Sequence, residues 1–365
     1  MGADHVDVPV TLNHSTPNTV FVRVKTANGS GANYVYSGAY YKPVDTYLIF
    51  RPGDPLTQTV AIPIAKTKEQ GHFKVGFPEA PQGANNGKSS AEVTSATGAQ
   101  PTKAITAGFR KPHAFKATGQ LTYDMSLNNV RWSGKGGPGE FSTSFTHGRS
   151  QPGNAETGLY LDNTMYPSAE PPFAVKNGAL ILHSQMLAQS ISYQGVRYGY
   201  GAAVLNGRNM PETQLTYGQY EWQATMPNRH GSWPALWLIG VQGWPPEIDV
   251  YEGFGQNNSF DFDRDITANI HGGPINKRTF TRSMWIDATR AYGIQHVASG
   301  KHTFALDVEA DYITWFVDGM ETYQARNPFS EPFYPVMDVA VKTTGSYSGG
   351  SGDMAIYSFK VWKKR

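Results

Sequence analysis

The chain is built from short runs rich in Val, Thr, Tyr and Phe, and Gly, Asn, Asp and Pro separate these runs. Such runs are typical of β-strands bounded by turns, and the 39 Gly and 24 Pro residues supply many turn positions. Long helical patterns of Ala, Leu, Glu and Lys are missing. A length of 365 residues favours two domains, with one large β domain as the alternative. We therefore predict an all-β protein whose core is buried between packed sheets.

Residues 1–112 form a first compositional block. About seven short strands in a block of this length are typical of an immunoglobulin-like β-sandwich. Turns are expected at Arg51–Asp54 and at Gly83–Gly87. The expected strands are Val6–Leu12, Thr19–Lys25, Tyr34–Ala39, Thr46–Phe50, Thr57–Ile64, His72–Phe77 and Ala91–Ser95.

Residues 113–365 form a second block, and we predict that the two blocks are separate domains. The stretch Thr94–Lys111 at the end of the first block is small and polar. We interpret it as a linker or as a strand that enters the next domain. The second block is long for an immunoglobulin-type sandwich and suits a larger jelly roll.

The six residues Glu247–Glu252 (Glu-Ile-Asp-Val-Tyr-Glu) carry most of the chemical information in the chain. On a regular strand Glu247 and Asp249 share a face, whereas Glu252 points the other way. One extra residue, a β-bulge, would return Glu252 to the face of the other two acids. Like charges packed together require that one acid stays protonated. A retaining glycosidase needs such a pair, an ionised nucleophile and a protonated acid; the alternative is a solvated, acidic edge strand.

Tryptophans surround this acidic stretch. Trp233 and Trp237 lie four residues apart, so on a strand they share one face, and Trp244 lies three residues before Glu247. Carbohydrate clefts often contain such residues, because the apolar C–H faces of sugars stack on aromatic rings. We therefore favour a cleft position for these side chains, and burial in the core of the sandwich is the alternative.

Several motifs of the second block, taken in order, resemble glycoside hydrolase family 16, the laminarinase, agarase and carrageenase group. The acidic stretch, with its E-x-D-x-x-E spacing, resembles the laminarinase and agarase side of the family. The resemblance implies a concanavalin-like β-jelly-roll sandwich with an open cleft. It also implies endo-acting, retaining hydrolysis of a polysaccharide. The other matching motifs are Asn177–Leu182, Thr216–Trp222, Gly231–Trp237, His302–Leu306, Trp315–Gly319 and Met354–Trp362.

The resemblance also assigns roles to the acids. Glu247 would be the nucleophile, and Glu252 would be the general acid and then the general base. Asp249 would lie between them and hold their charge states apart. This agrees with elementary electrostatics, because a carboxylate flanked by acids has its pKa raised and stays protonated near neutral pH.

Weaker assignments follow from the same resemblance. A cleft position near the acid/base Glu252 is expected for His271, and Asn206 and Arg208 are candidates for hydrogen bonds to sugar hydroxyls. Asp353 precedes the last motif, where family members often hold a structural calcium ion. An aspartate together with backbone carbonyls could bind such an ion, which would be non-catalytic. No cofactor is expected for catalysis.

The first block resembles the Calx-beta repeat in Asn28–Tyr34, Leu48–Asp54 and Val60–Ile64. Such repeats often bind calcium through clustered acids, but this block has seven acidic residues against eleven Lys and Arg, and no two acids are adjacent. Because calcium takes six to eight oxygen ligands, we expect an accessory or spacer module here.

Charge and composition exclude several other classes. The net charge is +2, and 16% of the residues are charged. The sequence has no basic stripe that would suggest nucleic-acid binding and no Lys/Arg run that would suggest binding to a membrane surface. No apolar run approaches a membrane span. Cysteine is absent, which excludes disulfides and thiol catalysis. We expect a secreted, extracellular monomer that acts on a polysaccharide, although no export signal is visible at the start of this chain.

Two departures from the family pattern bear on the substrate. Pro246 stands where laminarinases commonly have Gly, and the region Pro274–Ala298 matches no family pattern. A β-glucan, a galactan or a bacterial exopolysaccharide would fit equally well. A non-hydrolytic carbohydrate-binding protein and a transglycosylase on the same fold are the alternative functions. The presence of both Glu residues argues against the first, and the sequence does not separate the second from hydrolysis.

Overall fold

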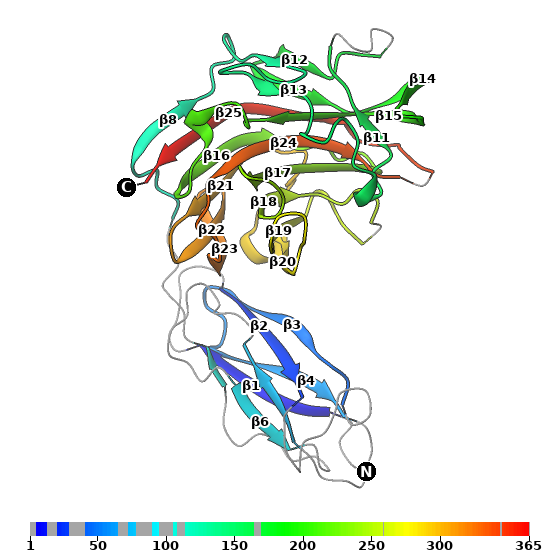
Figure 1. Ribbon diagram of the computed structural model, residues 1–365. Helices are drawn as coiled ribbons and strands as arrows, with labels where there is room; N and C mark the ends of the chain where they lie inside the picture. Colours follow the sequence, from blue (N-terminus) through cyan, green and yellow to red (C-terminus); the bar gives the residue numbers. More distant parts are fainter. Residues whose placement is uncertain are drawn as a thin grey trace. The chain divides into compact units, whose positions relative to one another are not determined.

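A computed structural model of the chain describes residues 5–12, 20–28, 41–64, 72–77, 90–94, 105–107, 114–163, 169–257, 259–343 and 345–364. The chain divides into two compact units. Unit 1 comprises Met1–Ala114 with Glu321–Arg326, and unit 2 comprises Phe115–Met320 with Asn327–Arg365. Figure 1 shows that both are built almost entirely from strands, which confirms the predicted all-β class.

Unit 1 contains two small sheets with the strand orders β4-β1-β7 and β3-β2-β5-β6. All pairs within them are antiparallel except β1 with β7, which run parallel. The strands are β1 (His5–Leu12), β2 (Val20–Ala27), β3 (Asp45–Phe50), β4 (Thr57–Pro63), β5 (His72–Gly76), β6 (Ser90–Thr94) and β7 (Ile105–Ala107).

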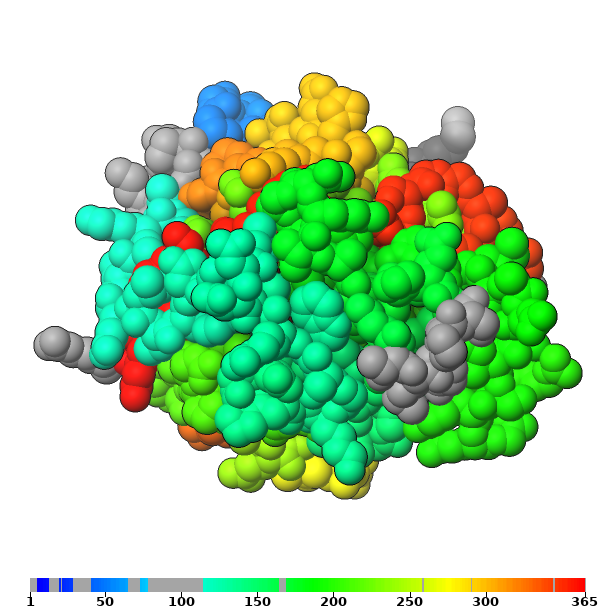
Figure 2. Space-filling model, turned by 90° about the horizontal axis from the view of Figure 1, so that it is seen from above, coloured from blue at the N-terminus to red at the C-terminus, as the bar shows by residue number. Residues whose placement is uncertain are grey.

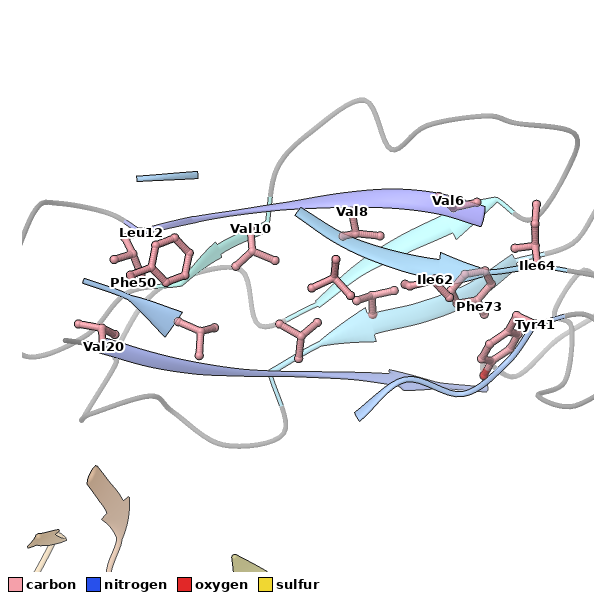
Figure 3. Packing of buried hydrophobic residues seen from close by; sticks show 14 residues of the cluster. Val6, Val8, Val10, Leu12, Val20, Tyr41, Phe50, Ile62, Ile64 and Phe73 are labelled. Atoms are coloured by element: carbon pink, nitrogen blue, oxygen red, sulfur yellow. The ribbon is translucent and has the colours of Figure 1, made fainter. Parts of the chain in front are cut away.

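The core of unit 1 follows from the alternation of its strands. In β1 every second residue is buried, so one face of the strand packs inward. The side chains from the two sheets meet between them (Figure 3), and Phe73 stacks on Tyr41 with 4.3 Å between the ring centroids. The buried residues shown include Val6, Val8, Val10, Leu12, Val20, Phe50, Ile62 and Ile64.

The sequence predictions for unit 1 agree with six of these strands, and the turn at Arg51–Asp54 is closed by a hydrogen bond from the Asp54 amide to the Arg51 carbonyl of 3.0 Å. Of the two interpretations of Thr94–Lys111, a strand is present at Ile105–Ala107, which form β7, and it pairs with Val10–Leu12 of the same unit. The expected strand Tyr34–Ala39 and the expected turn Gly83–Gly87 lie outside the described residues.

Unit 2 contains a ten-stranded sheet with the order β20-β19-β18-β17-β24-β15-β10-β9, and β11 and β14 also pair with β15. Figure 1 shows β24, β17, β18 and β19 side by side. The strands of this sheet are β9 (Trp132–Ser133), β10 (Phe141–Ser142), β11 (Gly158–Tyr160), β14 (Gln185–Tyr193), β15 (Val196–Asn206), β17 (Ser232–Gly240), β18 (Glu247–Glu252), β19 (Asp265–Gly272), β20 (Phe280–Asp287) and β24 (Phe333–Val341).

The second layer of unit 2 belongs to an eight-stranded sheet with the order β12-β13-β25-β16-β21-β22-β23 and with β8 paired to β25, and residues Glu321–Arg326 of β23 are grouped with unit 1. Its strands are β8 (Gln120–Asp124), β12 (Phe173–Lys176), β13 (Ala179–His183), β16 (Gly218–Thr225), β21 (His302–Val308), β22 (Tyr312–Val317), β23 (Met320–Arg326) and β25 (Asp353–Lys363). The described helices are short: α1 (Ala288–Tyr292), and the 3-10 helices η2 (Pro152–Asn154) and η3 (Pro211–Thr213).

The two layers of unit 2 bury large aromatic side chains between them. Trp222 of β16 stacks on Phe359 of β25 with 4.8 Å between ring centroids, and Tyr251 of β18 meets Phe304 of β21 edge-on at 5.1 Å. These rings are fully buried. The ten-stranded sheet therefore packs one face on the second layer, and its other face is available for a site.

The segments that precede β16 in the sequence, coloured cyan to green in Figure 2, form much of the face of the molecule seen in that view. Among the described residues, no helix is long and apolar enough to cross a membrane.

Candidate active site

The acidic strand β18 carries the bulge that the sequence predicts. Against β17, Tyr251 pairs with Leu236 and Asp249 pairs with Trp237, so Val250 is the extra residue of β18. The register against β19 shifts at the same place. The bulge brings Glu252 to the face of Glu247 and Asp249, because one added residue reverses the alternation of a strand.

The same face continues across the neighbouring strands, since residues opposite each other in an antiparallel pair share a face. On one side of β18, Glu247 lies opposite His271 and Asp249 lies opposite Asn269. On the other side, Asp249 lies opposite Trp237. The three acids therefore lie on a face lined by polar side chains of β19 and by tryptophans of β17. We call this the acidic face.

Glu247 is contacted from two sides. The indole nitrogen Nε1 of Trp244 donates a hydrogen bond of 2.6 Å to its Oε2. The imidazole Nε2 of His271 lies 3.4 Å from its Oε1, and Nδ1 of His271 lies 2.9 Å from the hydroxyl of Thr281. His271 thus lies in the site, as the resemblance predicts. Its nearest carboxylates are those of Glu247 and Asp249, and it also lowers the pKa of Glu252, the neighbour that the resemblance predicts.

Glu252 receives two hydrogen bonds from side chains of the acidic face. The indole Nε1 of Trp233 donates to its Oε1 at 2.7 Å, and the amide of Asn269 donates to its Oε2. Thr267, which lies opposite Glu252 in the register, donates its hydroxyl to the Glu252 carbonyl at 3.1 Å. Both the side chain and the backbone of Glu252 are therefore held in place.

Asp249 is the most enclosed of the three acids, with 2% of its surface exposed. Among the described residues its Oδ2 has no hydrogen bond, and it lies 3.3 Å from Nε2 of His271. On the opposite side of the sheet, the indole of Trp315 donates to the Asp249 carbonyl at 2.7 Å. The second layer therefore fixes the backbone at the centre of the acidic strand.

Burial raises the pKa of all three acids. Burial and then the charge of Asp249 raise the pKa of Glu252 to about 8, against the lowering effect of its hydrogen bond from Trp233. Burial raises the pKa of Asp249 to about 8, and burial and Asp249 hold the pKa of Glu247 well above its usual range. Burial therefore favours the protonated form of these acids, which suits a general acid, whereas Trp244 and His271 favour the ionised form of Glu247.

Trp237 lies on the acidic face, as predicted, but it is only 8% exposed. The ring of Phe145 packs against it with 6.0 Å between centroids, and its indole donates to Oδ1 of Asp338 at 2.7 Å. Trp233 is partly buried, and the Lys342 ammonium lies 4.6 Å from the centroid of its ring. Of the three tryptophans near the acids, Trp244 is the most open, at 36% exposed.

Asp338 belongs to a second set of buried acids on this face. It lies in β24 opposite Ala235, which in turn lies opposite Glu252. The hydroxyl of Tyr160 lies between Asp338 and Glu156, at 3.3 Å and 2.8 Å. Burial and Glu156 hold the pKa of Asp338 well above its usual range, and burial raises the pKa of Glu156 to about 7.

The two residues predicted near β15 have different positions. Asn206 is 1% exposed, and its amide donates to the carbonyls of Ser142 and Ser144 at 3.3 and 2.9 Å. The prediction of a sugar contact for Asn206 therefore does not fit, because its amide supports this backbone segment. Arg208 donates to the carbonyl of Lys135 at 3.3 Å and is partly exposed, so it stays a candidate.

Asp353, the expected calcium ligand, is paired with a histidine. Its Oδ1 lies 2.5 Å from Nδ1 of His183, and this contact lowers the pKa of Asp353. Calcium takes oxygen ligands, so an ion bound at Oδ1 of Asp353 would have to displace the imidazole of His183, and the calcium site stays a prediction. Among the described residues, the one group of three acids or histidines close enough to hold a cation is Glu247, Asp249 and His271.

Two contributors to the site were missed from the sequence. Asn269 and Asp338 contact Glu252 and Trp237, but they are separated from them by 17 and 101 residues. The alternation of Thr267, Asn269 and His271 along one strand is the only local signal that could have identified the first. Nothing local marks the second.

The two-layered β fold, with two Glu and one Asp on its free face, defines the class of this protein as a glycoside hydrolase. Residues 179–361, half of the chain, match the family described as glycosyl hydrolases family 16. The chain belongs to this family.

Two curated relatives from Rhizobium meliloti (strain 1021) are similar to about half of this chain. Endo-1,3-1,4-beta-glycanase ExsH is 30% identical over 192 residues, which is 52% of this chain and 38% of the relative. Endo-1,3-1,4-beta-glycanase EglC is 29% identical over 198 residues, 53% of this chain and 39% of the relative. The matches therefore span well under half the length of these relatives.

Solved structures share the fold. The catalytic domain of an endo-1,3-beta-glucanase (laminarinase) from Thermotoga petrophila RKU-1 superposes with a TM-score of 0.54 at 22% identity, covering 68% of this chain and all of that domain. LamAcat from Zobellia galactanivorans gives a TM-score of 0.51 at 19% identity, covering 67% of this chain and 97% of that one. These neighbours confirm the predicted jelly roll.

Proposed function

We propose that this protein is an endo-acting β-glycanase that hydrolyses internal bonds of a polysaccharide with retention of configuration. The observation that carries the proposal is the bulge at Val250, which places Glu247, Asp249 and Glu252 on one face. A regular strand would have turned Glu252 into the core. An acidic edge strand without function would need neither the bulge nor the indole donors.

In the first step Glu247 attacks the anomeric carbon and forms a covalent glycosyl ester. Glu252 gives its proton to the leaving oxygen, so that the bond breaks without releasing an alkoxide. Its raised pKa keeps that proton in place near neutral pH. Trp244 and His271 face the carboxylate of Glu247, and their donors stabilise its ionised form.

In the second step Glu252, now ionised, removes a proton from water, and the hydroxide displaces Glu247 from the sugar. Trp233 and Asn269 hold the Glu252 carboxylate between the two steps. Asp249 lies between the two Glu residues in the strand, and its charge raises the pKa of both. A sugar hydroxyl in place of water would give transglycosylation, so that activity is the second candidate.

We propose a β-1,3/1,4-linked glucan or a bacterial exopolysaccharide as substrate, because two relatives are named endo-1,3-1,4-beta-glycanases. We also propose that the protein acts outside the cell as a monomer. Unit 1 would then be an accessory module, and its likeness to the Calx-beta repeat stays a prediction. Neither nucleic acid nor a membrane is proposed as a partner.

The test is a product screen on laminarin, mixed-linkage β-glucan, agarose, carrageenan and bacterial exopolysaccharides, with reducing ends read by mass spectrometry. Wild type is expected to release discrete oligosaccharides, and proton NMR of the first products should show the retained anomer. Glu247→Gln should lose more than about a thousandfold of turnover, because the nucleophile is gone, while still binding the polymer. Glu309→Gln, at a half-exposed carboxylate, is the matched control.

Equal turnover by Glu247→Gln and wild type would contradict the mechanism. Binding to one polymer without any products from the wild type would instead identify a carbohydrate-binding protein on the same fold. First products with inverted configuration would still support a hydrolase, but they would rule out the covalent intermediate.

A further inference from the structure

Trp285 is a large aromatic side chain that belongs to none of the motifs that carry the family resemblance. It lies on β20, the edge strand of the ten-stranded sheet, and 43% of its surface is exposed. In the register Trp285 lies opposite Thr267, and Thr267 lies opposite Glu252. Because opposed residues share a face, Trp285 stands on the acidic face at the level of the acid/base Glu252.

A continuous row of rings joins Trp285 to the catalytic acid. The ring centroids of Trp285 and Phe260 are 5.6 Å apart, those of Phe260 and Phe254 are 5.9 Å apart, and those of Phe254 and Trp233 are 5.6 Å apart. Trp233 in turn hydrogen-bonds Glu252. Phe260 is 8% exposed, so it supports Trp285 from below while Trp285 remains open.

The indole N–H of Trp285 is available. Trp233, Trp237 and Trp244 each donate their N–H to a carboxylate of this face. Among the described residues, the structure gives Trp285 a ring contact with Phe260 and no hydrogen bond to its indole. An indole of this kind offers both an apolar ring and a free donor, and a sugar offers an apolar C–H face and hydroxyl acceptors.

Trp285 lies too far from the acids to contact the sugar ring that is attacked, so it would contact a different ring of the chain. Trp285 is two strands from Glu252, or about 9–10 Å at the usual spacing of strands. We propose that Trp285 is the platform of a separate subsite, where a pyranose ring of the same polysaccharide chain stacks outside the ring held by the acids. This subsite rests on the proposed glycanase function and deepens it.

The test compares Trp285→Ala and Trp285→Phe with Leu121→Ala, a matched loss of a half-exposed apolar side chain on β8 of the other sheet. Each full-length variant is assayed on the polymer that the wild type cleaves best. The frequency of cleavage at each bond of a defined oligosaccharide of the same linkage is measured in oxygen-18 water. Thermal unfolding of each variant is recorded in parallel.

Trp285→Ala is expected to lose about tenfold in kcat/KM on the polymer, because binding energy from a remote ring contributes to catalysis. It should also shift the cleaved bonds away from the register that fills this subsite. Trp285→Phe should restore most of both, since the ring is kept, and Leu121→Ala should change neither.

An unchanged cleavage pattern, with kcat/KM within about twofold of wild type, would overturn the subsite even if Trp285→Ala melted earlier. In that case cleavage by the wild type would still support the proposed function. Absence of cleavage by the wild type on every polymer would overturn both.

Discussion

We predict that the hydrogen bond from Trp233 to Glu252 sets the alkaline limit of activity. The general acid must hold a proton, so activity should fall as pH rises through the pKa of Glu252, about 8. The indole stabilises the ionised carboxylate and lowers this pKa. Trp233→Phe removes the 2.7 Å bond and keeps an aromatic ring. A hydrogen bond to a charged group contributes about 1.5 kcal/mol, and about 1.4 kcal/mol equals one pKa unit, so the alkaline limb should move up by about one pH unit.

Asp249→Asn should move the same limb in the opposite direction. The charge of Asp249 raises the pKa of Glu252, so an isosteric neutral side chain lowers it. The loss of activity on the alkaline side should then occur at a lower pH than in the wild type. The two variants differ in overall activity, and only the position of the limb is compared.

The assay is kcat/KM against pH, which reports the ionisations of the free enzyme. Wild type, Trp233→Phe and Asp249→Asn are each normalised to their own maximum. Shifts of both variants in the same direction would refute the electrostatic reasoning. An unmoved limb in Trp233→Phe would show that Glu252 is not the group that titrates.

Two predictions concern stability. Nη2 of Arg149 lies 2.6 Å from Oδ2 of Asp162, and both side chains are 6% exposed, so Arg149→Met removes the cation beside a buried carboxylate and should cost about 3–5 kcal/mol in urea unfolding. Adding Asp162→Asn should recover part of that loss, and an equal loss in the single and double variants would contradict a charge effect. Because His183 occupies the carboxylate of Asp353, EDTA should leave the melting temperature unchanged. A drop that calcium chloride reverses would show that an ion displaces the imidazole.

Local chemistry was sufficient to predict six strands of unit 1 and the bulge of β18. Val6, Val8 and Val10 are buried in alternation with more exposed residues, because successive side chains of a strand point to opposite faces. The bulge could be inferred because only an added residue reconciles the spacing of Glu247 and Glu252 with one shared face. In both cases the residues that decide the outcome are close in sequence.

Long-range contacts decide what the sequence did not show. The parallel pairing of Val10 with Ile105 joins residues far apart in the chain, so a small, polar stretch gave no sign of it. Asn206 was expected to face a sugar, yet the carbonyl of Ser144 accepts its amide from 62 residues away. Phe145, whose ring packs against Trp237, also belongs to a segment that is distant in the sequence. Burial of a polar or aromatic side chain depends on such partners, and no local pattern contains them.

The tryptophans of the acidic face have a structural role besides the proposed contact with a sugar. Trp233, Trp237 and Trp244 each donate an N–H to a carboxylate. A buried carboxylate needs donors, and an indole is a donor that brings no positive charge. A Lys or Arg in the same place would bind the acids as ions and lower their pKa, which would remove the proton that catalysis uses. Neutral indole donors satisfy the buried carboxylates and lower their pKa less than a full positive charge would, which accounts for the interleaving of aromatic residues and acids in this part of the sequence.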